Sequence, residues 1–402
     1  MSIATLSSPG TIGVGLVGSG FMGRAHAQAF RAVGGLFDLP LRPRLSMLAD
    51  TTMDGATRAA ASLGFEHACD DWRELVADPN VDLVAITTPN ALHAPIALAA
   101  LAAGKHVYCE KPLSVTLDEA TRMCAAARAA GTVSAVGFNY LANPMLQVAR
   151  EIVASGEIGE ITFYRGIHAE DFMADPAAPF SWRCRPDQAG GALADIGSHA
   201  LSMARFLLGD VERVFASLDT IHHRRPDPAR PGTMLPVTID DSAHMLLRFH
   251  DRPLTAHVCT TWLASGRDMQ LGFEIAGTRG GLSFSQERFN ELRLYRAGEA
   301  PGRSGFRTLH AGPAHGDYGA FCPAPGHQIG FGDLKTIEVA RLLGAIAGHG
   351  TPIVDFDSAA TIAALSDAAR RSSLEERWIS LPRDAPAAAA AYASPANSEV
   401  DR

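Results

Sequence analysis

The first 140 positions alternate between short apolar runs and longer segments with helical spacing. Five runs are almost entirely apolar, as in strands buried on both faces of a parallel sheet: 12–17, 45–49, 81–87, 106–109 and 133–138. Helical spacing of apolar residues separates them, starting at Arg24 and over 53–63, 70–76, 91–103 and 117–130. An irregular insert, 34–43, lengthens the first connection. The pattern predicts an α/β fold with a doubly wound parallel sheet in an N-terminal domain, residues 1–139.

From about position 140 the pattern changes to β-type alternation interrupted by turns. Strands are expected at 161–167, 242–249, 254–261, 271–275, 281–284, 291–295 and 378–381, and helices at 144–155, 190–209, 335–348 and 358–371. We therefore expect a C-terminal α+β domain over 140–384 with a large, mostly antiparallel open sheet. Segment 298–332 has little periodicity and is expected to be a functional or mobile loop. The Ala/Pro/Ser-rich segment 385–402 is expected to be a disordered tail.

A glycine-rich turn follows the first apolar run. It reads Gly18-Ser19-Gly20-Phe21-Met22-Gly23 and leads into the first helix. Gly18 suits a tight turn, Gly20 allows a pyrophosphate to approach the backbone, and Gly23 allows the helix to pack closely on the strand. A purely structural glycine turn is the alternative. The strand before the motif and the helix after it favour a dinucleotide site, with Phe21 and Met22 at the start of the helix.

Polar residues follow the next strands at their carboxyl ends, where ligands bind in open α/β sheets. Asp50 ends the second run and is placed to accept hydrogen bonds from the adenosine ribose, which favours NAD over NADP. Its alternative role is to cap the following helix. Arg24 could instead face a phosphate. Thr88, Asn90 and His93 follow the third run and are expected to line the cofactor crevice.

The fourth run ends in Glu110-Lys111-Pro112. An acid and a lysine pinned by proline would fix a cation near the expected nicotinamide position. We predict a cis bond between Lys111 and Pro112, because a turn there would aim the ammonium into the cleft. Without that context, Glu110 and Lys111 would form a solvated ion pair.

A second constellation lies in the helical segment 190–209. Asp195 and His199 are four positions apart and therefore share one helix face. The carboxylate could orient the imidazole and raise its basicity, which would give a base that titrates near neutrality. An exposed i,i+4 pair is the alternative. Gly190, Gly191 and Gly197 favour the functional interpretation, since small residues leave room for a ligand.

Composition limits the range of partners and compartments. The 402 residues carry a net charge of −8 without a basic run, which argues against nucleic acid and anionic membranes as partners. The six cysteines are widely spaced, with no metal-binding pattern, so we expect reduced thiols, no metal and a cytoplasmic location. We find no apolar stretch long enough to span a membrane and no secretory signal at the N-terminus.

These motifs together resemble the Gfo/Idh/MocA family of NAD(P)-dependent sugar and cyclitol dehydrogenases. The resemblance covers 12–381 and rests on the glycine turn, Thr88-Pro89-Asn90-x-x-His93, Glu110-Lys111-Pro112, Gly137-Phe138-Asn139-Tyr140 and Gly190-Gly191-x-Leu193-x-Asp195-x-x-x-His199. It implies catalytic roles for Lys111, Asp195 and His199, NAD as cofactor, and a C-terminal sheet whose open face forms homodimers or homotetramers. Residues expected to border the substrate are Asn139, Tyr140, His168, Asp171, Trp182 and Arg183.

Within the family, the chain is most similar to enzymes that oxidise the C3 hydroxyl of pyranosides. This similarity rests on Ala174-Asp175-Pro176, Ser181-Trp182-Arg183, 305–308 and 312–315. It implies hydride transfer from a secondary ring hydroxyl of a pyranose or an anhydrosugar such as levoglucosan. An inositol-type cyclitol dehydrogenase, an NADPH-driven reductase and a non-catalytic NAD-sensing regulatory protein are the alternatives. Two segments, Leu141-Ala142 and 167–172, depart from the family pattern, which leaves the exact sugar open.

Overall fold

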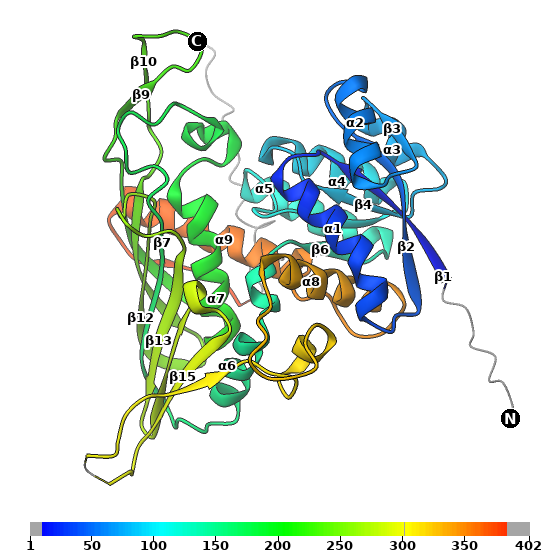
Figure 1. Ribbon diagram of the computed structural model, residues 1–402. Helices are drawn as coiled ribbons and strands as arrows, with labels where there is room; N and C mark the ends of the chain where they lie inside the picture. The colour runs from blue at the N-terminus through cyan, green and yellow to red at the C-terminus, as the bar shows by residue number, and fades with distance from the viewer. Residues whose placement is uncertain (1–9, 301, 384–402) are drawn as a thin grey trace, which may run out of the picture. The chain divides into compact units, whose positions relative to one another are not determined.

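The computed structural model of the protein describes residues 10–300 and 302–383. The chain divides into two compact units (Figure 1). Unit 1 contains the described residues up to Glu110, with Arg122–Ala142 and Ile329–Phe356. Unit 2 contains Lys111–Thr121, Asn143–Gln328 and the described residues from Asp357. The predicted domain ranges differ by assigning 111–121 to the N-terminal domain, and 140–142 and 329–356 to the C-terminal one. The predicted tail at 385–402 lies outside the described residues.

Unit 1 is built on a six-stranded sheet in the order β3-β2-β1-β4-β5-β6, in which every neighbouring pair is parallel. The strands are β1 (Gly10–Val17), β2 (Leu41–Ala49), β3 (His67–Cys69), β4 (Leu83–Ile86), β5 (His106–Cys109) and β6 (Ser134–Val136). All four residues of β4 are buried, as expected for a strand covered on both faces. The predicted doubly wound parallel sheet is confirmed.

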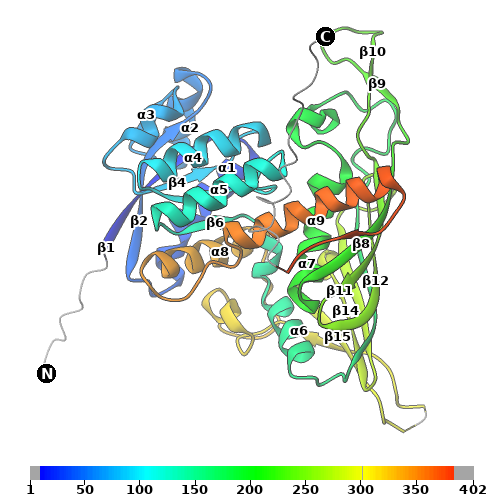
Figure 2. The ribbon, with the colours of Figure 1, turned by 180° about the vertical axis from the view of Figure 1, so that it is seen from behind.

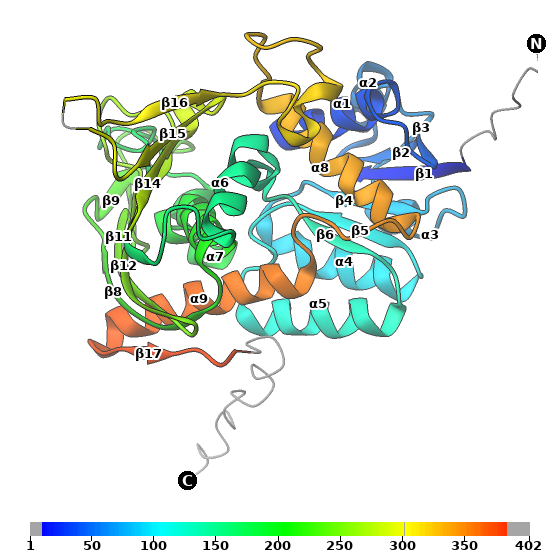
Figure 3. The same cartoon turned by 90° about the horizontal axis from the view of Figure 1, so that it is seen from below.

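Helices cover both faces of this sheet. They are α1 (Phe21–Leu36), α2 (Met53–Leu63), α3 (Trp72–Ala77), α4 (His93–Ala102), α5 (Leu117–Ala130) and α8 (Phe331–Ile346). In Figure 3, α1 and α8 lie on the opposite side of the sheet from α4 and α5. The predicted insert at 34–43 is wrong in extent, because α1 continues to Leu36 and β2 already begins at Leu41.

Unit 2 contains a nine-stranded sheet in the order β16-β15-β14-β13-β7-β12-β11-β8-β17. Its strands are β7 (Ile161–Ala169), β8 (Val211–Asp219), β11 (Ser242–Phe249), β12 (Arg252–Thr261), β13 (Gln270–Gly277), β14 (Gly280–Ser285), β15 (Glu291–Arg296), β16 (Arg307–His310) and β17 (Ile379–Ser380). β7 and β12 are parallel and the other pairs are antiparallel, which confirms the expected sheet. A separate hairpin joins β9 (Arg224–Pro226) and β10 (Met234–Pro236).

Helices α6 (Pro144–Ala154), α7 (Ser198–Leu208) and α9 (Phe356–Glu375) lie on one face of the large sheet (Figure 2). The Oγ atom of Ser372 in α9 accepts a hydrogen bond from the Ala216 backbone N–H in β8, at 3.0 Å. On the other face, side chains such as Phe163 and Leu246 are exposed. Along β11, buried and exposed positions alternate, the pattern of a sheet covered on one side.

Segment 298–332 is not the unstructured loop that its weak periodicity suggests. It contains β16, which pairs with β15, and a short 3-10 helix, Gly316–Ala320. The sequence of β16, Arg-Thr-Leu-His, is too polar to stand out as a strand. Within residues 10–300 and 302–383, no helix has the length and apolar character needed to cross a membrane.

Candidate active site

The glycine turn of unit 1 has the geometry of a phosphate-binding loop. Gly18 has φ = +94°, which strains any residue with a side chain. A Cβ on Gly23 would lie 2.2 Å from the Gly18 carbonyl oxygen, whereas a Cβ on Gly20 would meet no atom within 4 Å. Helix α1 begins at Phe21 without a side-chain cap, so its first N–H groups point out of the helix end. The space at Gly20 and the uncapped helix end fit a pyrophosphate.

Asp50 lies directly after β2, beside this turn. Its Oδ2 accepts hydrogen bonds from the Ser19 backbone N–H at 3.2 Å and from the Ser19 hydroxyl. Oδ1 accepts from the Thr51 N–H at 2.7 Å. Burial acts to raise the pKa of Asp50, but these hydrogen bonds outweigh it and place the pKa below its ordinary value. The side chain is therefore ionised, as a ribose-hydroxyl acceptor requires. The alternative that it caps α2 is wrong, because Thr52 is the N-cap.

Asn90 and His93 follow β4 and are buried at the carboxyl edge of the same sheet. The His93 side chain is fully buried, and its Nε2 lies 3.1 Å from the Thr88 carbonyl oxygen. The Thr88 hydroxyl is buried without a hydrogen-bond partner in the described part of the chain, and Asn90 is also buried. An unpartnered hydroxyl at this edge fits a bound polar group. The contact between His93 and the Thr88 carbonyl stabilises this loop. The predicted role of His93 in cofactor binding stays a prediction.

Glu110 lies in the interior of unit 1 rather than in a solvated pair with Lys111. Its Oε1 lies 2.8 Å from His26 Nε2 and accepts a hydrogen bond from Lys335 Nζ at 2.9 Å. Lys335 also donates to Glu338 Oε2 at 2.8 Å and to the Tyr108 hydroxyl at 3.1 Å. We call these five side chains the buried charge network. Its members could not be found from sequence spacing, because they come from three distant segments.

Burial and charge fix the protonation of this network. Burial, and then the charge of Lys335, lowers the pKa of His26 to about 4, so the ring is neutral at neutral pH. Burial acts to raise the pKa of Glu110, but the Lys335 charge and the His26 hydrogen bond hold it far below its ordinary value. Glu110 is thus an ionised carboxylate held by an ammonium and a neutral imidazole.

Asn139 and Tyr140 lie in a short 3-10 turn of unit 1, Asn139–Ala142. The Asn139 Nδ2 is buried and has no hydrogen-bond partner within the described residues. The Tyr140 ring lies 6.4 Å from that of Phe331, which stacks at 5.7 Å on the exposed ring of Phe21. Phe331 was not predicted, because it lies far away in the sequence at the start of α8.

In unit 2, Lys111 is held by Asp195. The Lys111 ammonium donates to Asp195 Oδ1 at 2.9 Å and to the Asp195 backbone carbonyl at 2.8 Å. Arg183 Nε donates to the other carboxylate oxygen at 2.8 Å. Burial acts to raise the pKa of Asp195, but the charges of Lys111 and Arg183 lower it to about 2. The predicted cis bond between Lys111 and Pro112 is confirmed.

Asp195 lies in a single π-helical turn, Leu193–Gly197, that leads into α7. This turn is wider than the α-helix predicted for the whole segment. The backbone N–H of Leu193 donates to Asp240 Oδ2 at 2.6 Å, and that of Ala192 to the Asp240 carbonyl at 2.9 Å. Asp240 therefore anchors the start of the turn. It was not predicted, because it lies before β11.

The three glycines around this turn do not leave room for a ligand, and that prediction is wrong. A Cβ on Gly190 would lie 2.4 Å from the Arg183 carbonyl oxygen, and one on Gly191 would lie 2.3 Å from Asp240 Oδ1. A Cβ on Gly197 would lie 2.9 Å from Thr260 Cγ2 in β12. The glycines instead let protein segments approach each other closely, and Gly191 additionally has φ = +107°.

His199 is buried on the first turn of α7, and its ring centroid lies 5.8 Å from that of His168 in β7. His168 Nδ1 lies 2.7 Å from the Ile196 carbonyl oxygen, and Nε2 lies 2.8 Å from Glu170 Oε1. The structure thus brings Asp195, His199 and His168 together around the π-turn. Glu170 was not predicted, although its spacing of two residues from His168 would suit one face of an extended chain.

Arg183 lies beside two aromatic rings of unit 2. Its guanidinium carbon lies 4.5 Å from the ring centroid of Trp182 and 5.2 Å from that of Phe172, and both rings are partly exposed. Asp171 Oδ2 accepts a hydrogen bond from the Gly266 backbone N–H at 2.9 Å. Arg183 therefore links the exposed aromatic rings to the buried carboxylate of Asp195.

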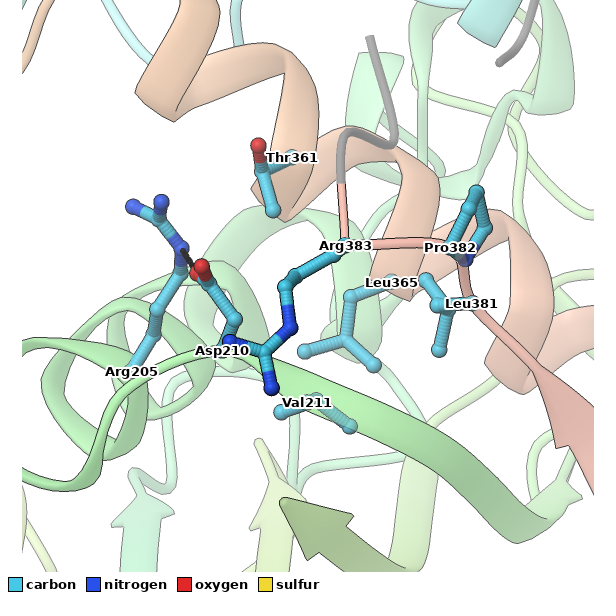
Figure 4. A pocket seen from close by; sticks show the side chains of 8 residues that line it. All are labelled: Arg205, Asp210, Val211, Thr361, Leu365, Leu381, Pro382 and Arg383. Carbon is cyan, nitrogen blue, oxygen red and sulfur yellow. Dashed lines mark hydrogen bonds and ion pairs between the residues drawn. The ribbon is translucent and has the colours of Figure 1, made fainter. Parts of the chain in front are cut away.

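A small cavity in unit 2 contains none of the predicted site residues (Figure 4). It lies beside the Arg205–Asp210 ion pair and the first half of α9, and its volume is about 10 Å³, enough for one water molecule. Within the described residues, no cluster of His, Cys, Asp and Glu side chains is arranged to hold a metal ion.

The chain is similar to known oxidoreductases over most of its length. The model of an oxidoreductase family with an NAD-binding Rossmann fold matches residues 12–138, and the model of the GFO/IDH/MocA C-terminal domain matches 146–283. The levoglucosan dehydrogenase of Pseudarthrobacter phenanthrenivorans is 38% identical over 385 residues, which cover 92% of this chain and 98% of that protein.

Solved structures agree with these matches. A levoglucosan dehydrogenase in complex with NADH and levoglucosan is 38% identical, with a TM-score of 0.88 over 92% of this chain and 100% of that one. An NAD-binding oxidoreductase from Klebsiella pneumoniae is 41% identical, with a TM-score of 0.88 over 92% of this chain and 99% of that one. The glycine turn, the Lys111–Asp195 contact and these matches together show that the chain is an NAD-binding oxidoreductase of the Gfo/Idh/MocA family.

Proposed function

We propose that this protein is an NAD-dependent dehydrogenase that oxidises a secondary ring hydroxyl, at C3, of a pyranose sugar or an anhydrosugar such as levoglucosan to a ketone. The observation that carries the proposal is the buried, ionised Asp195, which holds Lys111 and lies in the π-turn that His168 and His199 also adjoin. The relative that is similar over 98% of its own length is a levoglucosan dehydrogenase, which supports a sugar as substrate.

NAD would be held by groups of unit 1. The N–H groups at the start of α1 would bind the pyrophosphate, and the ionised Asp50 would accept hydrogen bonds from the adenosine ribose. Thr88 and Asn139 bring buried polar atoms that have no hydrogen-bond partner within the described residues, and these suit a polar ligand. When bound, NAD⁺ supplies the acceptor for the hydride that leaves the sugar carbon.

The proton chemistry belongs to unit 2 in this proposal. His199 would take the proton of the reacting hydroxyl, and the Lys111 ammonium would donate a hydrogen bond to the same oxygen as its charge develops. Asp195 would hold Lys111 in position by accepting two hydrogen bonds from its ammonium, one at the carboxylate and one at the backbone carbonyl. Arg183 would keep that carboxylate in place from its other side.

We further propose that the protein is a cytoplasmic homodimer or homotetramer that assembles through the open face of the large sheet. Exposed apolar side chains on that face, Phe163 and Leu246, support an interface there. All six cysteines lie in the described part of the chain and none is joined in a disulfide, which supports a reducing compartment. An inositol-type cyclitol dehydrogenase and a non-catalytic NAD sensor rank below this function, because no observation in unit 2 favours them.

A substrate panel tests the function directly. Reduction of NAD⁺ and NADP⁺ would be followed with levoglucosan, glucose, simple glucosides and myo-inositol. We expect turnover with a pyranose or anhydrosugar and with NAD⁺. The Lys111→Ala variant should still bind NAD and should lose about 10²–10³ in kcat, the usual effect of removing one oxyanion donor. Turnover of myo-inositol alone would favour the cyclitol enzyme, and NAD binding without any turnover would favour the sensor.

A further inference from the structure

Both ring nitrogens of His168 face oxygen atoms. Nδ1 lies 2.7 Å from the backbone carbonyl oxygen of Ile196, in the π-turn, and Nε2 lies 2.8 Å from Glu170 Oε1. The His168 side chain is 1% exposed and that of Glu170 is 17% exposed, so water does not compete freely for these contacts. A carbonyl oxygen can only accept a hydrogen bond, and Nδ1 therefore carries a hydrogen.

The second nitrogen then requires a second proton. A neutral imidazole has one N–H, so Nε2 would present a lone pair to Glu170. An ionised carboxylate presents only lone pairs as well, and two such atoms do not approach to 2.8 Å in a buried site without a proton between them. The pair therefore contains one proton more than a neutral imidazole beside an ionised carboxylate.

We propose that His168 and Glu170 share a proton as an ion pair whose positive end, the His168 ring, lies beside His199 and favours the neutral, proton-accepting form of His199. The part about His199 rests on the proposed function, in which His199 is the base. The two rings lie 5.8 Å apart between centroids, close enough for a charge on one to act on the other. His168 is then a positioning residue, rather than the sugar ligand suggested by the resemblance, because both of its ring nitrogens are already engaged.

The charged groups around His168 support this assignment. In β12 and β13 the residues paired with His168 are Thr260 and Leu271, neither of which is charged. His257 and Cys259 in β12, and the Arg165–Glu274 ion pair, occupy positions of opposite parity and so lie on the other face of the sheet.

The π-turn and α7 complete the surroundings. The π-turn contributes Asp195, whose carboxylate is bonded to Lys111 and Arg183, and the nearby part of α7 contributes His199. Arg205 lies further along α7 and is paired with Asp210. Glu170 is therefore the carboxylate that holds the extra proton on His168.

The proposal can be tested on the free protein by ¹⁵N NMR of histidine-labelled enzyme. The signals of His168 and His199 would be assigned from their loss in His168→Gln and His199→Gln. We expect hydrogens on both ring nitrogens of His168 at neutral pH. In Glu170→Gln the new amide can donate to Nε2, so His168 should keep only the hydrogen on Nδ1.

Glu170→Gln removes both charges of the ion pair. We expect the loss of the charge on His168 to dominate, because its ring lies 5.8 Å from that of His199, and His199 should then be easier to protonate. Because the two lost charges partly offset each other, we expect the His199 titration midpoint to rise by about 0.3 pH units in Glu170→Gln. The acidic limb of kcat/KM for the best sugar should move to higher pH by the same amount. Glu157→Gln is the matched control, since Glu157 pairs with Arg296 in the same unit and should leave both readouts unchanged.

Two results would overturn the proposal. One is a single N–H on His168 in the unmodified protein at neutral pH, and the other is an unchanged His199 midpoint in Glu170→Gln. These readouts do not need turnover. If the NMR signals show the shared proton but the protein oxidises no sugar, the proposed function is wrong and the proposal for the His168–Glu170 pair is still supported.

Discussion

At the scale of single residues, the site depends on carboxylates whose charge is fixed by their neighbours. Asp195 has a pKa of about 2 because two cations offset the cost of its burial. Asp50 is held in the ionised form by hydrogen bonds from Ser19 and Thr51. Both side chains therefore stay negatively charged throughout the physiological pH range, one beside Lys111 and the other beside the glycine turn.

The charge of Asp50 leads to a prediction about cofactor choice. In Asp50→Ser, the carboxylate can no longer bind ribose hydroxyls or repel a 2′-phosphate. We expect the KM for NAD⁺ to rise about tenfold, equivalent to about 1.4 kcal/mol, and the preference for NAD⁺ over NADP⁺ to shrink. Initial rates with both cofactors would measure it. Asp54→Ser on the exposed start of α2 is the control, and an unchanged ratio in Asp50→Ser would contradict the assignment.

His26 gives a prediction about acid stability. The pKa of an unperturbed histidine ring is 6.5, whereas the pKa of His26 in the folded protein is about 4. Its contribution to stability is therefore complete above about pH 7 and is lost as the pH falls towards 4, because the unfolded chain takes up the proton first. Urea titrations should show a loss of up to about 3 kcal/mol across this window.

The control separates His26 from the general effect of acid. His26→Gln can still donate to Glu110 but cannot titrate, so its free energy of unfolding should fall less between pH 7 and pH 4. His67→Gln, at an exposed position in β3, should retain the full dependence. A wild-type slope in His26→Gln would show that other groups cause the acid loss.

The catalytic candidates could be predicted from the sequence, but their partners could not. Lys111, Asp195 and His199 lie in motifs that resemble a known family, but the pattern paired Asp195 with His199 and did not predict its contact with Lys111. That Arg183 bonds to Asp195 was not foreseen, since it was expected to face the sugar. Side-chain pairing between separate segments depends on tertiary packing, which leaves no local pattern in the sequence.

At the scale of elements, long apolar runs predicted the strands of unit 1, whereas short or polar strands were missed. β3 has three residues and β16 has the sequence Arg-Thr-Leu-His, so neither produces clear periodicity. β8 was also missed, because buried and exposed positions do not alternate regularly along its nine residues. The π-turn at Leu193–Gly197 could not be foreseen, because α- and π-helical spacing differ too little over five residues.

The glycine before the π-turn allows a quantitative test of close packing. Gly191 and Gly209 both have positive φ, at +107° and +96°, but only at Gly191 would a Cβ meet other atoms within 4 Å. We expect Gly209→Ala to lose about 1–3 kcal/mol for the backbone strain alone. Gly191→Ala should lose a further 1–3 kcal/mol, roughly, because its Cβ collides with Asp240.

Thermal and urea unfolding of the two variants would measure this difference. Equal losses in both would mean that Asp240 moves away at no cost and does not anchor the turn. A larger loss in Gly191→Ala, accompanied by a lower kcat, would tie the position of Asp195 to the Asp240 contact.

At the scale of the whole molecule, the proposed assembly rests on the open sheet face. Leu246 is 38% exposed on that face, while Leu374 is 84% exposed on α9. Leu246→Glu would place a charge in the proposed interface and should shift the protein towards a monomer in analytical ultracentrifugation. Leu374→Glu is the matched control and should leave the mass unchanged. Dissociation by the control alone would move the interface to another surface.

The buried charge network affects how the protein folds while it is being synthesised. Glu110 and Lys335 are 225 positions apart, yet the carboxylate reaches the ammonium in the interior of unit 1. During synthesis, the N-terminal sheet is complete on the ribosome long before α8 has been translated. Until then Glu110 has no ammonium to balance its charge, and burying it alone would be strongly unfavourable. The Rossmann unit therefore gains its final stability late in translation, and fragments that stop short of residue 335 should be natural targets for chaperones and proteases.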